Sequence, residues 1–226
     1  ARALAAARGT LAALSPALLI SHLACADTPA HPLNRRQLEA FRAVRDLFPG
    51  VPASLANSAG IFLGPEYHFD LARPGIALYG AVFAEGHAPL ATVATLEARI
   101  LRIRDVPAGE SVGYGAGQTL DHPARIAILG VGYADGYLRT ASSSNARPGA
   151  RVHVGGQNAP LVGRVSMDLM AIDVTGIPNV AQGDWVELFG RHVPVDEVAA
   201  TAGTIGYELL TGLGRRYVRI YLGEAA

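Results

Sequence analysis

The sequence predicts an α/β segment followed by an all-β segment. In residues 1–88, helical periodicity alternates with short apolar runs, which is the pattern of parallel βα units. Residues 89–226 consist mainly of short runs separated by glycine, proline, asparagine or aspartate, as in a small β-barrel or sandwich. With 226 residues, half of them hydrophobic, the chain is long enough for two domains with sizeable cores.

The α/β segment is expected to contain helices alternating with three buried strands. Helices are expected at residues 3–14 and 34–48, and a short helix is expected to begin near Ser58. The second helix has Asn34 as its predicted N-cap, and its apolar face consists of Leu38, Phe41, Val44 and Leu47. The strands are expected at residues 17–24, 52–57 and 75–80. Because three strands cannot close a barrel, we expect them to be the last part of a larger one.

The second segment is expected to contain strands, two helices and a final strand. Leu96, Ala98 and Ile100 alternate with polar residues, and Leu101 and Ile103 continue on the opposite parity, which predicts a β-bulge. The Gly155-Gly156 pair predicts a hairpin turn. Further strands are expected at residues 125–133, 151–154, 161–165, 169–174, 185–189 and 217–222, and helices at 195–202 and 205–213.

Charge and cysteine content restrict the classes of partner. The 19 basic and 19 acidic residues cancel, which disfavours nucleic acid and anionic membrane surfaces and leaves small ligands or other proteins. All 19 basic residues are arginine, so the chain has no lysine and no lysine amine for chemistry. The single Cys25 excludes an internal disulfide and fits a reducing compartment, so we expect a cytoplasmic protein.

The first 26 residues resemble a secretory signal only superficially. Arg2 and Arg8 precede an apolar run, but Ser15-Pro16 and Ser21-His22 interrupt it. No apolar stretch reaches the roughly 18 residues that a membrane-spanning helix requires, so we expect no membrane partner. Because the first residue is alanine, we also expect the chain to have been cut or processed.

Polar residues near the predicted parallel strands are the first candidates for chemistry, because α/β barrels place their sites at the carboxyl ends of strands. Taken singly, His22, Ser58 and Arg73 have ordinary structural explanations: a core histidine, a helix cap and a surface arginine. Together, Ser58 at a helix N-terminus and the backbone N–H groups of Gly75 and Ile76 predict an anion pocket of the kind that barrel enzymes use for phosphate.

The β segment offers two tyrosines in glycine-rich motifs, Tyr114 and Tyr133. Nearby glycines let the backbone come close to a ligand or to another chain. The alternative is a pair of β-turns whose tyrosines serve only in packing. Met167-Asp168 is, on its own, no more than the start of a strand.

The ordered series of these segments resembles the alanine racemase family over essentially the whole chain. Each short segment is common by itself, whereas their order is specific. The matching segments are residues 22–27 (HLACAD), 54–58 (SLANS), 73–80 (RPGIALYG), 112–115 (VGYG), 132–136 (GYADG), 163–168 (GRVSMD) and 207–210 (YELL).

The resemblance implies the last βα units of a TIM-type barrel that holds pyridoxal 5'-phosphate, over residues 1–88, and a C-terminal β-barrel or sandwich domain over residues 89–226. It also implies alanine as substrate, no metal ion, and a head-to-tail homodimer whose active sites are shared between subunits. The family's cofactor-binding lysine and a substrate-binding arginine are then expected in an upstream part that these residues do not include.

Racemisation requires one base on each face of the α-carbon. The resemblance implies that Tyr114 is the base acting on L-alanine and that the absent lysine is the other. A phenol of ordinary pKa, about 10, is a poor base at neutral pH, so positive charge is needed nearby. His22 resembles the family histidine near this tyrosine and the cofactor ring. Arg73 resembles the arginine that faces the pyridine nitrogen and leaves it largely unprotonated, which limits side reactions.

The remaining roles implied by the resemblance concern binding. Asn57, Ser58, Gly75 and Ile76 are expected to bind the cofactor, the last three at its phosphate. The backbone N–H of Met167 is expected to bind the substrate carboxylate from the partner subunit, with Tyr133 at the entrance and Asp168 in support. Some family members have a phosphate-contacting tyrosine near the C-terminus, where this chain has glycine, and Tyr217 is not assigned that role.

Two other interpretations stay open at this point. One is a related barrel-fold enzyme that uses the same cofactor, such as a serine or lysine racemase or an amino-acid decarboxylase. The other is a non-catalytic β module for dimerisation, which the absence of lysine from the chain favours.

Overall fold

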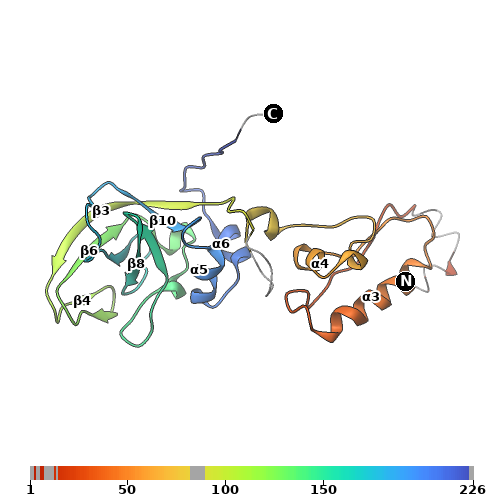
Figure 1. Ribbon diagram of the computed structural model, residues 1–226, viewed down its shortest axis with the longest axis horizontal. Coiled ribbons are helices and arrows are strands. Elements are labelled where there is room, and N and C mark those ends of the chain that lie inside the picture. Colours follow the sequence, from red (N-terminus) through yellow and green to blue (C-terminus); the bar gives the residue numbers. More distant parts are fainter. Residues whose placement is uncertain (1–2, 4–5, 8–12, 14, 82–89, 224–226) are drawn as a thin grey trace. The chain divides into compact units, whose positions relative to one another are not determined.

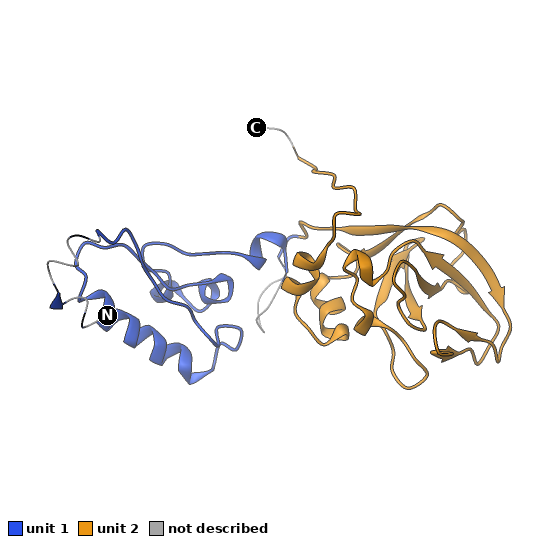
Figure 2. Cartoon of the chain, turned by 180° about the vertical axis from the view of Figure 1, so that it is seen from behind, with its two compact units in different colours: residues 1–91 blue, residues 92–226 orange. Residues whose placement is uncertain are grey.

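The computed structural model describes residues 15–81 and 90–223, together with residues 3, 6, 7 and 13. Two compact units divide the chain, Ala1–Ala91 and Thr92–Ala226 (Figure 2). The helix predicted at residues 3–14 lies mostly outside the described residues. Within the described ranges, no helix combines the length and the hydropathy needed to cross a bilayer.

The first unit contains parallel βα structure, as predicted, although its strands are shorter than expected. Strand β1 (Leu19–Ile20) pairs in parallel with β2 (Ala53–Ser54), and a single parallel bridge joins Asn57 to Arg73. Helix α3 (Pro32–Arg45) buries Leu38 and Phe41 in a core with residues of both strand segments. The shorter elements are α4 (Ser58–Phe62) and the 3₁₀ helices η1 (Pro65–Tyr67) and η2 (Ile76–Tyr79).

The predicted N-cap of α3 is wrong. The helix begins at Pro32, a residue suited to the first helical position because it has no N–H to satisfy, and Nδ1 of the preceding His31 accepts a hydrogen bond from the Leu33 N–H. Asn34 is buried inside the helix, where its Nδ2 donates to the carbonyl oxygens of Cys25 and Thr28, both at 3.0 Å. Its side chain therefore anchors the preceding loop.

The strand predicted at residues 75–80 is also wrong, because this segment forms η2. Pro74 has no N–H to donate to a neighbouring strand. The N–H groups of Gly75 and Ala77 donate to the side-chain oxygen of Ser58, at 2.7 and 3.4 Å. These two backbone N–H groups are therefore bound to the Ser58 side chain and cannot pair with a neighbouring strand. The chain turns after the single bridge at Arg73.

The second unit, which contains the labelled strands β3, β6, β8 and β10, is shown in Figure 1. Its six barrel strands are antiparallel and close in the order β10-β3-β6-β9-β8-β7. Of the two β architectures predicted, the structure therefore has the barrel. The barrel strands are β3 (Leu96–Val106), β6 (Ala124–Leu129), β7 (Arg151–Val154), β8 (Gln157–Val162), β9 (Met170–Asp173) and β10 (Trp185–Phe189). A hairpin of β4 (Ser111–Val112) and β5 (Gln118–Thr119), the 3₁₀ helices η3 (Tyr133–Asp135) and η4 (Arg139–Ala141), and the helices α5 (Val195–Ala202) and α6 (Gly206–Gly212) complete the unit.

Two local predictions in this unit are confirmed. Ile100 pairs with Leu129 and Arg102 with Ile128, so Leu101 is the extra residue of a bulge. Gly155 and Gly156 form a two-residue turn between paired Val154 and Gln157, with φ of 58° and 79°. Positive φ at both positions is the requirement of a type I′ hairpin turn.

The final strand predicted at residues 217–222 is wrong. This segment has no strand, and Val218 and Tyr221 are largely exposed. An alternating apolar pattern yields a strand only where a neighbouring strand offers free hydrogen-bonding groups. In a closed barrel every strand is already paired on both sides, so this barrel has no edge for another strand.

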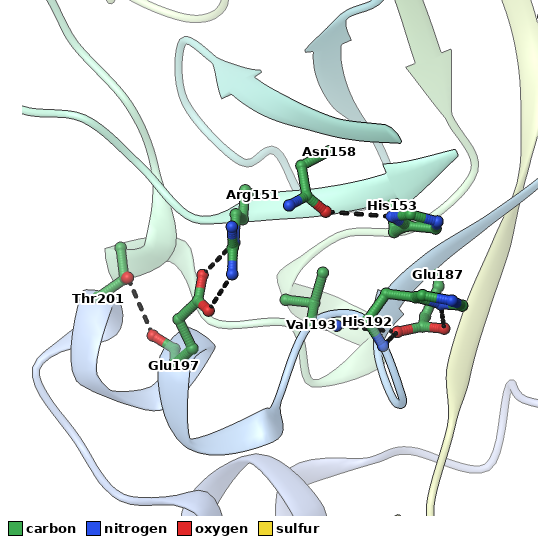
Figure 3. Close-up of polar contacts among 8 residues, drawn as sticks. All are labelled: Arg151, His153, Asn158, Glu187, His192, Val193, Glu197 and Thr201. Atoms are coloured by element: carbon green, nitrogen blue, oxygen red, sulfur yellow. Dashed lines mark hydrogen bonds and ion pairs between the residues drawn. The ribbon is translucent and has the colours of Figure 1, made fainter. Parts of the chain in front are cut away.

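The barrel closes between β10 and β7 through the pair Glu187 and His153. The ring of His153 stacks on that of His192, with centroids 3.9 Å apart and planes 8° from parallel (Figure 3). Nδ1 of His153 lies 3.1 Å from Oδ1 of Asn158 on β8. Two hydrogen bonds from Arg151 to the carboxylate of Glu197 join β7 to α5 (Figure 3).

The carboxylate of Glu187 accepts three hydrogen bonds at this closure. The donors are Nδ1 of His192 at 2.9 Å and the backbone N–H groups of His192 and Val193 at 2.7 and 3.0 Å. Burial alone raises the pKa of Glu187, but the hydrogen bonds from His192 and Val193 outweigh it, so the pKa lies below its ordinary value. The ionised form therefore stabilises the closed barrel.

We expect Glu187→Gln to lower the free energy of unfolding by about 2 kcal/mol at neutral pH, since hydrogen bonds to a charged group are lost. The folded-state pKa is below the unfolded-state value. The contribution is therefore fully present above the unfolded-state pKa and is lost as pH falls through the folded-state pKa. Urea denaturation of both proteins at pH 7 and near pH 3 measures this difference, which should shrink at the lower pH.

Glu110→Gln is the matched control, because Glu110 is exposed next to a turn and its carboxylate makes no hydrogen bond or ion pair with the described residues. This control should change stability by less than about 0.5 kcal/mol. A Glu187→Gln effect of equal size at both pH values contradicts the assignment of stability to the ionised carboxylate.

Candidate active site

The predicted site residues fall into two groups, one in each compact unit. The first group lies at the carboxyl ends of β1 and β2, which share one edge because the strands are parallel. Half-buried Arg73 reaches both strands there: Nη1 donates to Oγ of Ser54, and Nη2 donates to the carbonyl oxygen of Ser21 at 2.7 Å. Arg73 is thus a fixed member of this edge and not a free surface arginine.

His22 and Asn57 meet at the same edge, with His22 Nε2 3.3 Å from Asn57 Nδ2. Asn57 is the N-cap of α4, and its Oδ1 accepts from the Gly60 N–H at 2.9 Å. This cap fixes the orientation of the amide, so Nδ2 donates and Nε2 of His22 accepts. A neutral His22 therefore carries its hydrogen on Nδ1.

Gln37 of α3 holds the His22 segment in place and was not predicted. Its Nε2 donates to the carbonyl oxygen of His22 at 2.9 Å, and its Oε1 accepts from the Ala24 N–H at 3.0 Å. A glutamine in an amphipathic helix carries no local signal of such a role. Only the fold brings it next to a segment 13 to 15 residues away.

Ser58, which we predict to form an anion pocket with Gly75 and Ile76, lies next to the start of η2. Ser58 is buried at the start of α4, and its Oγ accepts from the N–H groups of Gly75 and Ala77. The Gly75 N–H, expected to be available for an anion, is therefore occupied by a hydroxyl. Backbone donors converge on one oxygen atom at this position.

In the second unit, Tyr114 lies in the turn of the β4–β5 hairpin and is 72% exposed. The turn is made by Gly113 and Gly115, whose φ angles of 84° and 66° are strained for most side chains. The tyrosine is therefore presented to solvent and is not packed into the core of this unit.

Arg164 lies close to both glycines beside Tyr114. A Cβ atom on Gly113 would lie 2.8 Å from the backbone nitrogen of Arg164, and one on Gly115 would lie 2.9 Å from its Nη1. The hairpin turn thus rests against the GRVSMD segment, and the guanidinium of Arg164 lies directly beside the turn that carries Tyr114.

Tyr133 and Met167 lie in two turns that are bound to each other through their backbones. The Tyr133 N–H donates to the Ser166 carbonyl at 3.0 Å, and the Ala134 N–H donates to the Met167 carbonyl at 2.9 Å. A Cβ atom on Gly132 would lie 2.3 Å from the Ser166 oxygen, so this approach requires glycine. Both side chains are substantially exposed.

Asp168 joins this pair of turns through Arg216, a residue that sequence reasoning missed. Nη1 of Arg216 contacts Asp168 Oδ1 at 2.7 Å, and its Nε contacts Asp135 Oδ1 at 3.1 Å. The other carboxylate oxygen of Asp135 accepts from the Gly132 N–H at 2.9 Å. The hydrogen bond to Asp168, followed by the charge of Asp135, raises the pKa of Arg216 above its ordinary value.

Tyr217, next to Arg216, has a buried hydroxyl without a hydrogen-bond partner among the described residues. Burial, and secondly the charge of Asp135, raises the pKa of Tyr217 well above its ordinary value, so the phenol stays neutral. Within the described ranges, no cluster of three or more histidine, cysteine or acidic residues could hold a metal ion.

Comparison with known proteins identifies the family. Residues 1–82 match the family "Alanine racemase, N-terminal domain", and residues 93–221 match "Alanine racemase, C-terminal domain". A Rhizobium meliloti protein named alanine racemase is 53% identical over 223 residues, 95% of this chain and 59% of that protein. A biosynthetic alanine racemase of Agrobacterium fabrum is 54% identical over 220 residues, 93% of this chain and 56% of that protein.

A solved structure agrees with these matches. The alanine racemase of Bartonella henselae with covalently bound pyridoxal phosphate superposes with a TM-score of 0.88 at 39% identity, covering 98% of this chain and 61% of that one. This chain therefore spans less than two thirds of the proteins that it matches. Its two matched regions, its identity to the relatives and its barrel fold together show that the chain belongs to the alanine racemase family.

Proposed function

We propose that this chain forms part of a pyridoxal-phosphate-dependent enzyme that interconverts L-alanine and D-alanine, with Tyr114 as the base acting on L-alanine. The observation that carries the proposal is the hairpin turn, whose two glycines present Tyr114 to solvent and whose backbone lies beside the guanidinium of Arg164. The relatives' names and the cofactor in the Bartonella henselae structure support the same reaction.

We infer that the first unit supplies the hydrogen-bond donors for the cofactor. Its phosphate is an acceptor, and Ser58 Oγ already marks a point where the N–H groups of Gly75 and Ala77 converge on an acceptor oxygen. We assign phosphate binding to Ser58, Gly75 and Ile76, and support of the cofactor to Asn57 and His22. When bound, pyridoxal phosphate supplies the electron sink that makes the α-proton of an amino acid removable.

Arg73 acts as a permanent hydrogen-bond donor at the strand edge. A guanidinium does not release its proton at physiological pH, so facing a pyridine nitrogen it donates a hydrogen bond and leaves that nitrogen unprotonated. Its contacts with Ser54 and Ser21 fix its position. This arrangement limits the reaction to proton removal and return.

Tyr114 removes and returns a proton at its phenolic oxygen. The guanidinium of Arg164 lies beside the hairpin turn that carries Tyr114, and we assign to it the positive charge that the reaction needs near this base. The second base is a lysine, and because the chain contains none, we place it outside these 226 residues. One base on each face is the minimum that inversion at the α-carbon requires.

The paired turns of the second unit bind the substrate. The Met167 N–H has no acceptor among the residues that the structure describes, and we assign it to the carboxylate of alanine. Tyr133 lines the entrance, and Asp168 supports the Met167 turn through Arg216. We further propose a cytoplasmic homodimer with active sites shared between subunits, with residues 1–88 in the cofactor-binding barrel and 89–226 in the C-terminal domain.

Tyr114→Phe tests the catalytic assignment in the protein at its full natural length. Loss of the base should lower kcat/KM for racemisation about 10²- to 10⁴-fold. Both directions should fall equally, because the equilibrium between enantiomers is unity. Circular dichroism follows the racemisation. Exchange of the α-hydrogen with deuterated solvent should be lost from L-alanine and persist for D-alanine.

Tyr221→Phe removes the same atom from an exposed tyrosine and should leave the rate unchanged. If Tyr114→Phe keeps more than half of the wild-type rate, Tyr114 is not the base. If the unsubstituted protein with bound cofactor does not racemise alanine, the proposed function is wrong.

Ser58→Ala tests the phosphate site through binding alone. Removing Oγ takes the acceptor from two backbone N–H groups, so apo-protein stability should fall by about 1–3 kcal/mol. Fluorescence titration should show weaker binding of pyridoxal phosphate and little change for pyridoxal, which lacks the phosphate. The control Ser144→Ala also removes a hydroxyl that accepts from a backbone N–H, that of Arg147 in the other unit. Equal weakening for both ligands would exclude Ser58 from the phosphate site.

A further inference from the structure

Three segments of the second unit converge on Arg216. They are the turn at residues 132–136, the turn at 166–168 and the segment after α6 that carries Arg216 itself. The Gly214 N–H donates to the Asp135 carbonyl at 3.2 Å, and a Cβ atom on Gly136 would lie 2.1 Å from the Gly212 oxygen. The C-terminal segment is thus packed closely against the first turn.

The guanidinium of Arg216 makes two contacts of different character. Asp135 is buried, with a side chain 8% exposed, and its other oxygen holds the Gly132 N–H. Asp168 is half exposed and has Arg216 as its side-chain partner. One planar cation therefore joins a carboxylate inside the Tyr133 turn to a carboxylate that directly follows Met167.

The charges make this arrangement more than a mechanical link. The two aspartates place two negative charges in the turns that we assign to binding the carboxylate of alanine. A negative charge beside an anion site weakens binding, and a guanidinium between the carboxylates offsets that repulsion. Arg216 itself is about half exposed, so it remains within reach of solvent and salt.

We propose that Arg216 is a positioning residue for substrate binding, which holds the Tyr133 and Met167 turns together and offsets part of the negative charge of Asp135 and Asp168 beside the substrate carboxylate. The role in substrate binding rests on the proposed function. The joining of the turns does not depend on it, because it concerns the chain's own segments.

Arg216→Met keeps an unbranched, flexible side chain and removes the guanidinium with its charge. We expect KM for alanine to rise about tenfold, with kcat changed less than about threefold, because binding of an anion is weakened and the base is untouched. Raising the ionic strength should reduce the KM defect, since salt screens exposed charges. Arg216→Lys should restore part of the affinity, because it keeps the charge and loses the planar two-point contact.

Neutralising Asp168 in the same protein separates charge from packing. The double variant Arg216→Met with Asp168→Asn should recover most of the lost affinity, whereas a purely structural role predicts no recovery. Arg104→Met on β3 is the control, because Arg104 is exposed and makes no ion pair with the described residues. A KM rise that is the same in the single and double variants overturns the electrostatic role.

Amide hydrogen exchange tests the joining of the turns without turnover. Arg216→Met should speed exchange of the Tyr133 and Ala134 N–H groups, which bond to the Met167 turn, and leave the β6–β9 pairing protected. Unchanged exchange together with unchanged KM overturns the inference. If the unsubstituted protein does not racemise alanine but exchange responds as expected, the proposed function is wrong and only the positioning of the turns stands.

Discussion

The contact between the turns at residues 132–136 and 166–168 is the constraint on which the second unit's candidate site depends. Backbone meets backbone there, with a Cβ position at Gly132 only 2.3 Å from the Ser166 oxygen. No side-chain packing could bring Tyr133 and Met167 as close, because every other residue type places a carbon atom in that space. The same principle recurs at Gly113, where a Cβ atom would lie 2.8 Å from the backbone nitrogen of Arg164. Glycine is a packing requirement at both points, and at Gly113, where φ is 84°, it is a conformational requirement as well.

Strands and helices with strong local patterns were predictable from the sequence. β7, β10 and α5 have the predicted bounds, and the parity change near Leu101 correctly predicts the bulge, because each is encoded by side-chain alternation or by turn residues within a few positions. The two wrong strand predictions share a different cause. Residues 75–80 and 217–222 have strand-like patterns, but whether a strand forms depends on partners elsewhere: a serine 17 residues away in one case and a closed barrel in the other.

The residues of the candidate site also fall into those that a local pattern marks and those that it does not. The motifs that carry Tyr114, Tyr133, Met167, Ser58 and Arg73 are visible because glycine, proline or an unusual order of residues marks them. Gln37 and Arg216 carry no such mark. Each acts on a segment far away in the sequence, and Arg216 lies 48 residues beyond Asp168. Residues proposed to contact a ligand stand in recognisable local motifs here. Residues that only hold such a motif in place do not, because any neighbouring element can supply them.

The exclusive use of arginine as the basic residue fits this division of roles. The planar guanidinium groups of Arg73, Arg151 and Arg216 each make two contacts. A lysine ammonium is a point charge on a flexible stem and reproduces only part of this geometry. There is also a chemical consequence for the proposed cofactor. Pyridoxal phosphate carries an aldehyde that reacts with unprotonated amines, and guanidinium groups, which stay protonated, do not compete for it. A chain whose basic residues are all arginine can therefore place a positive charge, such as that of Arg73, at the proposed cofactor site without offering a competing side-chain amine.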